Sequence, residues 1–329
     1  MGDASTSGTT AEPNRHQGTV LPLRILTHNI RYANDNPVTH ERRWPERFPH
    51  LSSHFKYHTR QHFSPSSTIV CMQEVLHVQL QDLMHQSFNS SYPADWASVG
   101  VGRDDGATKG EYSPIIFRQS AWQCIHSETV WLNETGEVGR RGWDASSVRI
   151  LTCAILKFRE PSASTASLAN KTILAMNTHL DDQGELSRRE SAKLILRHTG
   201  RWQAQYSPDF TFLAGDLNSR PSGDAYHILN APGSGFVDTR KLIPDDNSDG
   251  KIYAYGNERT FTDFQGDPGA GGKHRIDFIH LGISKRADEE VADLEKVSNM
   301  VQAYGVLPNR FDDHVWMSDH RAVVVDLLI

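Results

Sequence analysis

Short apolar runs separated by polar turns dominate the chain after its first 20 residues. Runs of this length that are rich in β-branched and aromatic residues, and bounded by Gly, Pro, Asp or Asn, are typical of strands. The pattern therefore predicts many short strands, over residues 23–30, 68–73, 113–118, 121–131, 150–158, 171–179, 209–215, 275–281 and 322–328.

Helical spacing of apolar residues is found in three places between these runs. The clearest helix is expected over 185–202, and a second over 78–88. A third, over 42–62, is expected to be broken near its start by Pro45 and Pro49.

No linker or change of composition divides the chain after residue 20, so we expect a single α/β domain over 19–329, preceded by a disordered tail over 1–18. Many strands with few helices favour mixed sheets that are covered by helices. Polar loops rich in Gly, Ser or Asp are expected at 160–170, 244–256 and 266–273.

The net charge of the chain limits which kinds of ligand it is expected to bind. The chain has 329 residues, of which 37% are hydrophobic and 22% charged, and its formal net charge is −6. Proteins that grip long nucleic acid usually carry a basic field, because neutralising phosphates is their main source of affinity. A small phosphate ester, or a short single strand, therefore fits the charge better than tight duplex binding.

The three cysteines are too few and too scattered for a disulfide framework or a zinc site, which favours a reducing interior. The first residues lack the apolar core of a secretory signal, and no later run is long enough to span a bilayer. We therefore expect an intracellular protein, cytoplasmic or nuclear, that is a monomer without a protein partner. We expect His28 and His280 to be structural, and the other scattered histidines to lie on the surface.

Acidic, amide and imidazole side chains recur where the predicted strands end. These candidate site residues are Asn29, Glu74, Asn177, His179, Asp216, Asn218, Asp277, Asp319 and His320. Side chains at strand ends can converge at one edge of a sheet, where ligands bind in α/β folds. Carboxylate and amide oxygens suit a hard cation such as Mg²⁺ or Mn²⁺.

These residue types supply the parts of a metal-assisted hydrolysis. Asp216 can take a proton from an attacking water, and Asn218 can hold that water or a phosphate oxygen. His179 and His320 can donate to a phosphorane or a leaving oxygen. Each motif alone has a plainer explanation, because Gly-Asp-Leu-Asn is usually a turn and Glu74 could be the acid that opens a helix. The interpretation therefore rests on the occurrence of all the motifs together, in this order along the chain.

In that order the motifs resemble those of the endonuclease/exonuclease/phosphatase superfamily, which includes deoxyribonucleases, deadenylases, inositol polyphosphate 5-phosphatases and sphingomyelinases. The match covers nearly the whole chain after the tail, at 27–32 (THNIRY), 72–74 (MQE), 111–114 (EYSP), 177–181 (NTHLD), 215–218 (GDLN), 275–277 (RID) and 318–320 (SDH). More narrowly, 100–106 (GVGRDDG), 142–144 (GWD), 188–191 (RRES) and 260–264 (TFTDF) resemble a little-characterised bacterial and fungal branch, and 215–229 is similar to the deadenylase version of its motif.

The resemblance implies a four-layer α/β sandwich, in which two packed mixed β-sheets are flanked by helices. It also implies that Asn29, Glu74 and Asp319 hold Mg²⁺ or Mn²⁺. By the same resemblance, Asp216 and Asn218 position and activate the water.

The resemblance assigns further roles around the phosphate. Asp277 would orient His320, which would stabilise the phosphorane. His179 would contact the scissile phosphate, with Glu111 orienting it, and Tyr112 matches a tyrosine that some members use on that phosphate.

One departure from the family's pattern bears on the substrate. Asp182 stands where a basic or imidazole residue is expected, which makes the expected rim of the pocket more acidic. Basic and aromatic side chains that could bind phosphates and stack a base are the candidate substrate contacts, namely Arg31, Arg103, Arg140, Arg141, Trp143, Arg149, Arg188 and Arg220.

The shared chemistry leaves three hypotheses open. The leading one is a phosphodiesterase acting on nucleic acid, such as a 3′-to-5′ RNA exonuclease, by likeness to deadenylases. The acidic charge favours the second, a phosphatase of a small nucleotide or sugar phosphate. The third is a non-catalytic binding module on the same fold. A binding module of this kind should lack catalytic residues, whereas this chain has a suitable residue at every expected catalytic position.

Overall fold

The computed structural model of the chain describes residues 20–60, 67–91, 93–159, 168, 170–244, 254–265, 274–283 and 287–329. The expected tail over 1–18 lies outside the described residues, as do the expected loop 266–273 and most of the loops expected at 160–170 and 244–256.

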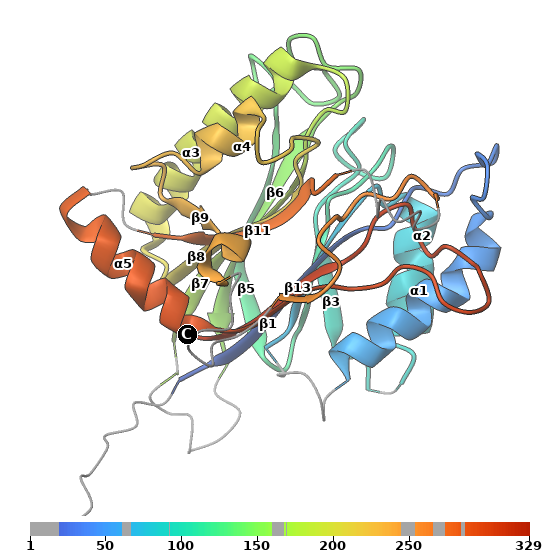
Figure 1. Ribbon diagram of the computed structural model, residues 1–329, viewed down its shortest axis with the longest axis horizontal. Coiled ribbons are helices and arrows are strands. Elements are labelled where there is room, and N and C mark those ends of the chain that lie inside the picture. Colours follow the sequence, from blue (N-terminus) through green and yellow to red (C-terminus); the bar gives the residue numbers. More distant parts are fainter. Residues whose placement is uncertain are drawn as a thin grey trace, which may run out of the picture.

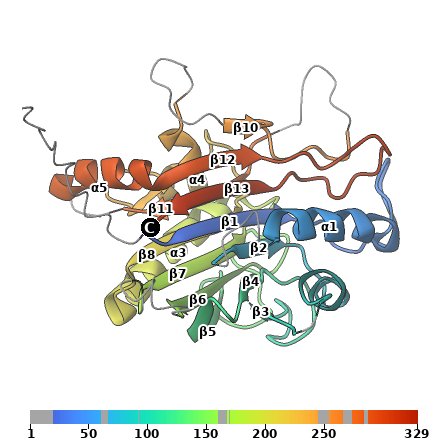
Figure 2. The ribbon, with the colours of Figure 1, turned by 90° about the horizontal axis from the view of Figure 1, so that it is seen from below.

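Two mixed β-sheets form the centre of the fold (Figure 1). The first has seven strands in the order β10-β12-β13-β1-β2-β4-β3, which can be followed across Figure 2. Their bounds are β1 (Pro22–Asn29), β2 (Ile69–Gln73), β3 (Trp96–Val99), β4 (Ile115–Arg118), β10 (Ala254–Gly256), β12 (Val301–Val306) and β13 (Val323–Leu328). The pairs β1–β2 and β10–β12 are parallel, whereas β1–β13 and β12–β13 are antiparallel.

The second sheet has six strands in the order β5-β6-β7-β8-β11-β9. Their bounds are β5 (Trp122–Trp131), β6 (Ile150–Phe158), β7 (Thr172–His179), β8 (Phe210–Asp216), β9 (Phe236–Asp238) and β11 (Asp277–Gly282). β7 and β8 are parallel, and β11 is antiparallel to β8.

Helices cover the outer face of each sheet, on opposite sides of the molecule in Figure 1. The first sheet is covered by α1, α2 and the π-helical segment η1, and the second by α3 and α4, while α5 lies beside β12. The bounds are α1 (Trp44–Thr59), α2 (His77–Asp82), η1 (Leu83–Phe88), α3 (Glu185–Tyr206), α4 (Asp224–Leu229), the 3₁₀ segment η3 (Thr239–Leu242) and α5 (Ala287–Met300).

Three hydrophobic clusters, counted over the described ranges, fill the three spaces between these four layers. Ile25 and Phe212 belong to the cluster between the two sheets. Trp202 of α3 packs with Leu174 of β7 in the second cluster, and Phe55 of α1 belongs to the third, under the first sheet. This layered core confirms the expected four-layer sandwich.

α1 runs without a break, so the interruption expected at Pro45 and Pro49 is wrong. Pro45 occupies one of the first helical positions, where its missing N–H has no intrahelical acceptor to lose. Pro49 lies inside the helix. It removes one hydrogen bond close to the N-terminus, a cost that the packing of Leu51 and Phe55 against the first sheet outweighs.

The apolar pattern missed the strands β3, β9, β10 and β12 and the helices α4 and α5. β10 falls inside the loop expected at 244–256, so that expectation is wrong for Ala254–Gly256. In β12, Gln302 and Ala303 are both exposed, and the pairing with β13 shifts register between Val301 and Ala303. The apolar positions therefore do not alternate as they do in a regular strand. In α5, Val291, Leu294, Val297 and Met300 recur every three residues, which is a helical spacing, although this segment was not among the expected helices.

Buried histidines are more numerous than expected. His28 and His280 are buried, as predicted. His54 was expected on the surface, but it is also buried, with its ring centroid 5.4 Å from that of His28. In the part of the chain that the structure describes, no helix combines the length and the apolar character needed to cross a membrane.

Candidate active site

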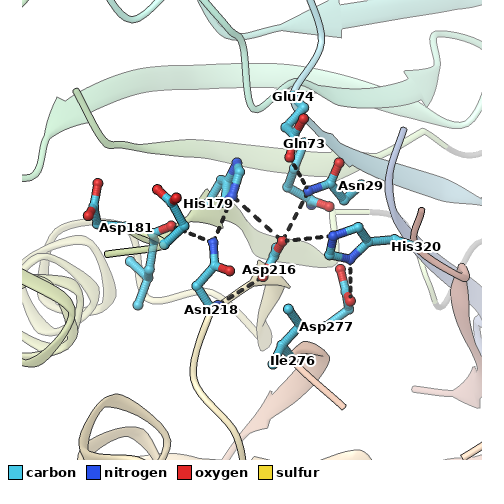
Figure 3. Close-up of polar contacts among 12 residues, drawn as sticks. Asn29, Gln73, Glu74, His179, Asp181, Asp216, Asn218, Ile276, Asp277 and His320 are labelled. Carbon is cyan, nitrogen blue, oxygen red and sulfur yellow. Dashed lines mark hydrogen bonds and ion pairs between the residues drawn. The ribbon is translucent and has the colours of Figure 1, made fainter. Parts of the chain in front are cut away.

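The strand ends of both sheets meet at one edge, and they bring the predicted polar residues together (Figure 3). In the second sheet, parallel pairing places His179 of β7 beside Asp216 of β8, and antiparallel pairing places Asp277 of β11 on the other side of Asp216. In the first sheet, Asn29 and Gln73 are partners at the ends of β1 and β2, and Glu74 follows directly. The register of five strands therefore fixes the positions of these side chains.

A buried arginine that the sequence did not indicate holds the loop after β1. Arg47 of α1 has no exposed surface, and its guanidinium donates to five backbone carbonyls. Two of these, on Ile30 and Met317, lie 3.0 Å and 2.7 Å away, and they tie the end of β1 to the segment before Ser318. Arg47 thereby fixes the spacing between Asn29 and Asp319.

Two residues at the same edge have strained backbone conformations. Glu74 and Asn218 both adopt left-handed backbone conformations, with φ of 59° and 44°. Such conformations cost a non-glycine residue on the order of 1–3 kcal/mol and occur mainly at functional positions. Gly215, with φ of 146°, is required because a Cβ there would lie 2.1 Å from the carbonyl oxygen of Thr178.

Asp216 lies at the centre of the cluster. Its Oδ2 accepts a hydrogen bond from Asn29 Nδ2 at 3.0 Å and lies 3.6 Å from His179 Nε2 and 3.7 Å from His320 Nε2. Burial, and then the nearby carboxylate of Asp277, raise the pKa of Asp216 to about 7. A carboxylate with this pKa can accept a proton near neutral pH.

His320 is held by Asp277. The His320 Nδ1 and Asp277 Oδ2 atoms are 2.9 Å apart, and both residues are buried. Burial opposes protonation of His320, but the carboxylates of Asp277 and Asp216 outweigh it and hold the pKa well above 6.5. The geometry thus presents an imidazolium whose Nε2 faces Asp216.

His179 lies on the other side of Asp216 from His320 and, unlike His320, is neutral. Its Nε2 accepts a hydrogen bond from Asn218 Nδ2 at 3.0 Å, and its Nδ1 lies 3.8 Å from Glu111 Oε2. Burial, together with Arg149 and Arg103, lowers the pKa of His179 well below 6.5. Burial raises the pKa of Glu111 to about 7, although Arg103 opposes it from 2.6 Å.

The donor set fits a divalent cation. Asn29 Nδ2 donates to Glu74 Oε1 at 2.9 Å, so the two expected metal ligands are in contact. Burial raises the pKa of Asp319, and Glu74 raises it further, which shows that the two carboxylates repel each other. A cation between them would relieve that repulsion. A second group, Asp216, Asp277 and His320, also offers three ligand atoms within 4.8 Å of one another.

A pocket of about 390 Å³ opens over Asp216. It is lined by Arg31, Tyr32, Val38, Glu74, Glu111, Ser147, Arg149, His179, Asp182, Asp216, Asn218, Phe261, Asp263, Asp319 and His320. Two of the expected substrate contacts, Arg31 and Arg149, are therefore in the lining. Arg188 and Arg220 line a smaller adjoining pocket together with Asn218.

Other expected site residues lie outside the lining of this pocket. Asn177 is fully buried, and its amide bridges the two sheets through the carbonyls of Met72 and Pro114. The hydroxyl of Tyr112 lies 3.0 Å from His77 Nδ1 and donates a hydrogen bond to the carbonyl of Ala107 at 2.8 Å.

Arg103 and Trp143 are also outside it. Arg103 pairs with Glu111, and the backbone N–H of Trp143 donates to Glu134 Oε1 at 3.0 Å. Neither residue is part of the lining of the pocket.

The rim is less acidic than the sequence indicated. Arg149 is buried, with Nε 3.1 Å from Asp181 Oδ2 and Nη2 2.8 Å from Asp182 Oδ1. One guanidinium therefore pairs with both acids and offsets one of their two negative charges, which the linear sequence did not reveal. The third nitrogen, Nη1, is buried without a hydrogen-bond partner among the described residues.

Sequence reasoning missed Phe261 and Asp263 in the lining. Phe261 forms isolated bridges with both His274 and His320, and its ring centroid is 4.9 Å from that of His320. The available signal was the segment 260–264, which resembles the bacterial and fungal branch and contains a carboxylate at Asp263.

The solved structures that match the chain support the fold described above. No family model and no curated protein matches the chain. Among solved structures, an endonuclease/exonuclease/phosphatase family protein from Bacteroides thetaiotaomicron is 25% identical with a TM-score of 0.74, and the match covers 94% of this chain and 96% of that one. One from Bacteroides vulgatus is 31% identical with a TM-score of 0.70, covering 93% and 98%.

A mannosyl-6-phosphatase from Bacteroides thetaiotaomicron is 25% identical with a TM-score of 0.72, covering 93% of this chain and all of that one, 100%. Further structures that are 15–17% identical, with TM-scores of 0.58–0.60, show likeness of fold alone.

Proposed function

The chain belongs to the endonuclease/exonuclease/phosphatase family, and we propose that it is a divalent-metal-dependent phosphomonoesterase that releases phosphate from a small phosphorylated metabolite. The observation that carries the proposal is the size of the pocket over Asp216. At about 390 Å³ it is large enough for one small ligand and lies near the lower end of ligand pockets. The 25% identical mannosyl-6-phosphatase supports the same class of substrate.

We assign the metal to Asn29, Glu74 and Asp319, which offer hard oxygen ligands beside the pocket. When bound there, Mg²⁺ or Mn²⁺ would supply Lewis-acid stabilisation of the phosphoryl oxygens. Both the ligand set and the choice of cation are part of the proposal.

The remaining residues act on the water and the phosphate. Asp216, with a pKa near 7, accepts the proton of the attacking water as its oxygen bonds to phosphorus. The ester P–O bond breaks, and the released alkoxide takes a proton from solvent and leaves as the alcohol. Asn218 orients the water or a phosphoryl oxygen. The imidazolium of His320, held by Asp277, donates a hydrogen bond to the charge that develops on the phosphoryl group.

Two cationic or donor groups complete the phosphate site in this proposal. The Nη1 of Arg149 is buried in the lining with no partner among the described residues, and it donates to a phosphoryl oxygen. His179, which lies across Asp216 from His320, contacts the same phosphoryl group. Glu111 acts through His179 as a positioning residue.

The second candidate is the phosphodiesterase that acts on nucleic acid, such as a 3′-to-5′ RNA exonuclease. The observation in its favour is the likeness of 215–229 to the deadenylase motif. A binding module without activity is the weakest candidate, because each catalytic residue type is present in the pocket or beside it.

The test is an activity panel with Mg²⁺ and Mn²⁺ on sugar phosphates, nucleoside monophosphates, single-stranded RNA and single-stranded DNA. Asp216→Asn, which keeps the shape of the side chain but removes the base, serves as the control. We expect release of inorganic phosphate from at least one small ester and none with the variant. Cleavage of RNA or DNA without phosphate release would replace the proposal with the second candidate, and silence across the panel would reject a catalytic role.

A further inference from the structure

The segment 100–106 (GVGRDDG) resembles the bacterial and fungal branch, yet the proposed chemistry gives none of its residues a role. It is the first arm of the loop that joins β3 to β4, and residues 107–111 are the returning arm. Three backbone hydrogen bonds of 3.0–3.1 Å join the two arms, from the N–H groups of Gly102, Arg103 and Asp104 to the carbonyls of Ala107, Glu111 and Lys109. The loop is therefore held in shape by its own backbone.

Contacts with the rest of the fold fix the place of this loop. Gly102 is required where the two arms approach each other, because a Cβ there would lie 2.3 Å from the carbonyl oxygen of Lys109. Trp131 Nε1 donates to the carbonyl of Arg103 at 2.6 Å. Beyond the returning arm, Tyr112 pairs with Val75, the residue that follows Glu74. The backbone around Arg103 is thus anchored to both sheets.

The loop places the guanidinium of Arg103 against the carboxylate of Glu111. Arg103 Nη1 donates to Glu111 Oε2 at 2.6 Å, and the two side chains are only 15% and 16% exposed. A second acid, Asp104, lies 3.9 Å from Arg103 Nε, but its side chain is 52% exposed, so solvent weakens that pair. A short, charge-assisted hydrogen bond with little solvent access holds the Glu111 carboxylate in one orientation.

The oxygen that Arg103 holds is also the one that faces His179. Glu111 Oε2 lies 3.8 Å from His179 Nδ1, which is buried without a hydrogen-bond partner among the described residues. Asn218 Nδ2 donates to His179 Nε2 at 3.0 Å, so Nε2 is an acceptor and the neutral ring carries its hydrogen on Nδ1. The protonated nitrogen therefore lies on the side of the ring that faces Glu111.

Arg103 does not itself reach the pocket over Asp216. Glu111 and His179 line this pocket, whereas Arg103 is absent from its lining. The sequence-based expectation that Arg103 contacts the substrate directly is therefore not the role that its position favours. An effect of Arg103 on a ligand in the pocket is transmitted by Glu111, to which its guanidinium is bonded.

We propose that Arg103 is a positioning residue, which holds the carboxylate of Glu111 opposite His179 Nδ1 and so keeps His179 Nε2 directed at Asp216. The inference rests on the proposed function, in which His179 contacts the phosphoryl group. It also gives the segment 100–106 a role, because the shape of this loop presents Arg103 to Glu111. An acceptor fixed opposite one ring nitrogen sets both the tautomer and the orientation of a histidine.

Nuclear magnetic resonance of the histidine rings tests the orientation apart from activity. The full chain, with Mg²⁺ present, carries ¹⁵N in its 17 histidines, and the His179 signals are identified by their loss in His179→Gln. We expect the hydrogen on Nδ1 in the wild type, and a shift of both ring nitrogen signals in Arg103→Met. A hydrogen on Nε2 in the wild type, or ring signals that Arg103→Met leaves unchanged, would overturn the inference.

The matched control is Arg201→Met. Arg201 forms an ion pair of similar length, 2.7 Å, with Glu128, and neither residue lines the pocket over Asp216. The control should leave the His179 signals as they are in the wild type. Circular dichroism checks the fold of each protein. If Arg103→Met does not fold, Arg103→Gln, which keeps a hydrogen-bond donor without the charge, replaces it with the same expected outcomes.

Turnover of p-nitrophenyl phosphate then tests the route by which Arg103 acts. We expect Arg103→Met to lower kcat/KM at least about tenfold, and Arg201→Met to behave as the wild type does. Because Arg103 acts through Glu111, the double variant Arg103→Met with Glu111→Gln should be no slower than Glu111→Gln alone. Losses that multiply in the double variant, or full activity of Arg103→Met, would contradict the positioning role.

The two proposals fail in different ways. If the proposed function is wrong, no small ester is hydrolysed, yet the ring signals of His179 still depend on Arg103. If only the positioning role is wrong, small esters are hydrolysed, while Arg103→Met changes neither the ring signals nor kcat/KM.

Discussion

Asp277 and Asp216 are direct partners in the antiparallel ladder between β11 and β8, and the imidazole of His320 lies within reach of both carboxylates. The ring is 2.9 Å from Asp277 through Nδ1 and 3.7 Å from Asp216 through Nε2. Burial, and then the charge of Asp277, raise the pKa of Asp216, while the carboxylates of Asp277 and Asp216 raise the pKa of His320 and hold it as an imidazolium. The acid–base character of the site therefore follows from the register of two strands.

Asp277→Asn should separate the positioning role of Asp277 from the chemistry at Asp216. The loss of the anion removes the main group that keeps His320 protonated, so we expect kcat to fall by about a hundredfold or more. The basic limb of the pH profile should move to lower pH, because His320 then loses its proton more readily. The profile of kcat/KM against pH is the measurement, and circular dichroism checks the fold. An unchanged basic limb would show that His320 does not act as an imidazolium.

Glu74→Gln should weaken the metal site, because one charged oxygen ligand is replaced by a neutral one. We expect EDTA to abolish the activity of the wild type, and the variant to need at least about tenfold more Mg²⁺ for half-maximal activity. Calorimetric titration with Mg²⁺ alone gives a second readout. Glu46→Gln, at an exposed position of α1, is the matched control and should behave as the wild type. If the variant keeps the Mg²⁺ requirement of the wild type, Glu74 is not a ligand.

Arg149→Met should destabilise the fold as well as the phosphate site. The carboxylate of Asp181 is buried and would lose its guanidinium, although it would keep hydrogen bonds from the backbone N–H groups of Ser146, Ser147 and Gly184. We expect a loss of roughly 2–3 kcal/mol in the free energy of unfolding, below the usual cost of breaking a buried ion pair.

The control for that prediction is Asp182→Asn, whose side chain is 47% exposed. It should cost less than about 1 kcal/mol, as expected for an exposed pair. Urea unfolding compares the three proteins. Equal stability of Arg149→Met and the wild type would contradict the structural part of the role assigned to Arg149.

The buried histidines should make the protein labile to acid. Burial lowers the pKa of His280 from 6.5 to about 4, and that of His28 likewise to about 4. Between pH 6.5 and 4 the unfolded chain binds protons that the folded chain does not, so stability decreases as the pH falls through this window.

His280→Gln should remove one of these protonation steps, and glutamine can still accept the hydrogen bond that Asn230 Nδ2 donates to His280 Nε2. We expect the free energy of unfolding to fall between pH 7 and pH 4 by roughly 3 kcal/mol less than in the wild type. Urea unfolding at several pH values measures the slope, and exposed His85→Gln is the control. Parallel slopes for His280→Gln and the wild type would show that His280 does not contribute.

The sequence by itself determined the fold class and the residue types of the site. Apolar runs such as 23–30 and 209–215 indicate strands because their side chains must be buried, and these runs appear at nearly the same positions as β1 and β8. The polar residues that end them, Asn29 and Asp216, were identified because a polar side chain at the end of a buried strand is conspicuous in a linear pattern. The family resemblance then gave each of them a role.

The tertiary structure decided which of those residues meet, and with what charge. Strand register brings His179, Asp216 and Asp277 together. The amide of Asn177 instead bridges the two sheets, and the hydroxyl of Tyr112 contacts His77. Pairings between distant segments, such as that of Arg149 with Asp182, made the rim less acidic than its sequence indicated. Net charge is a sum over the chain, whereas a binding site depends on charges within a few ångströms, and only folding sets those distances.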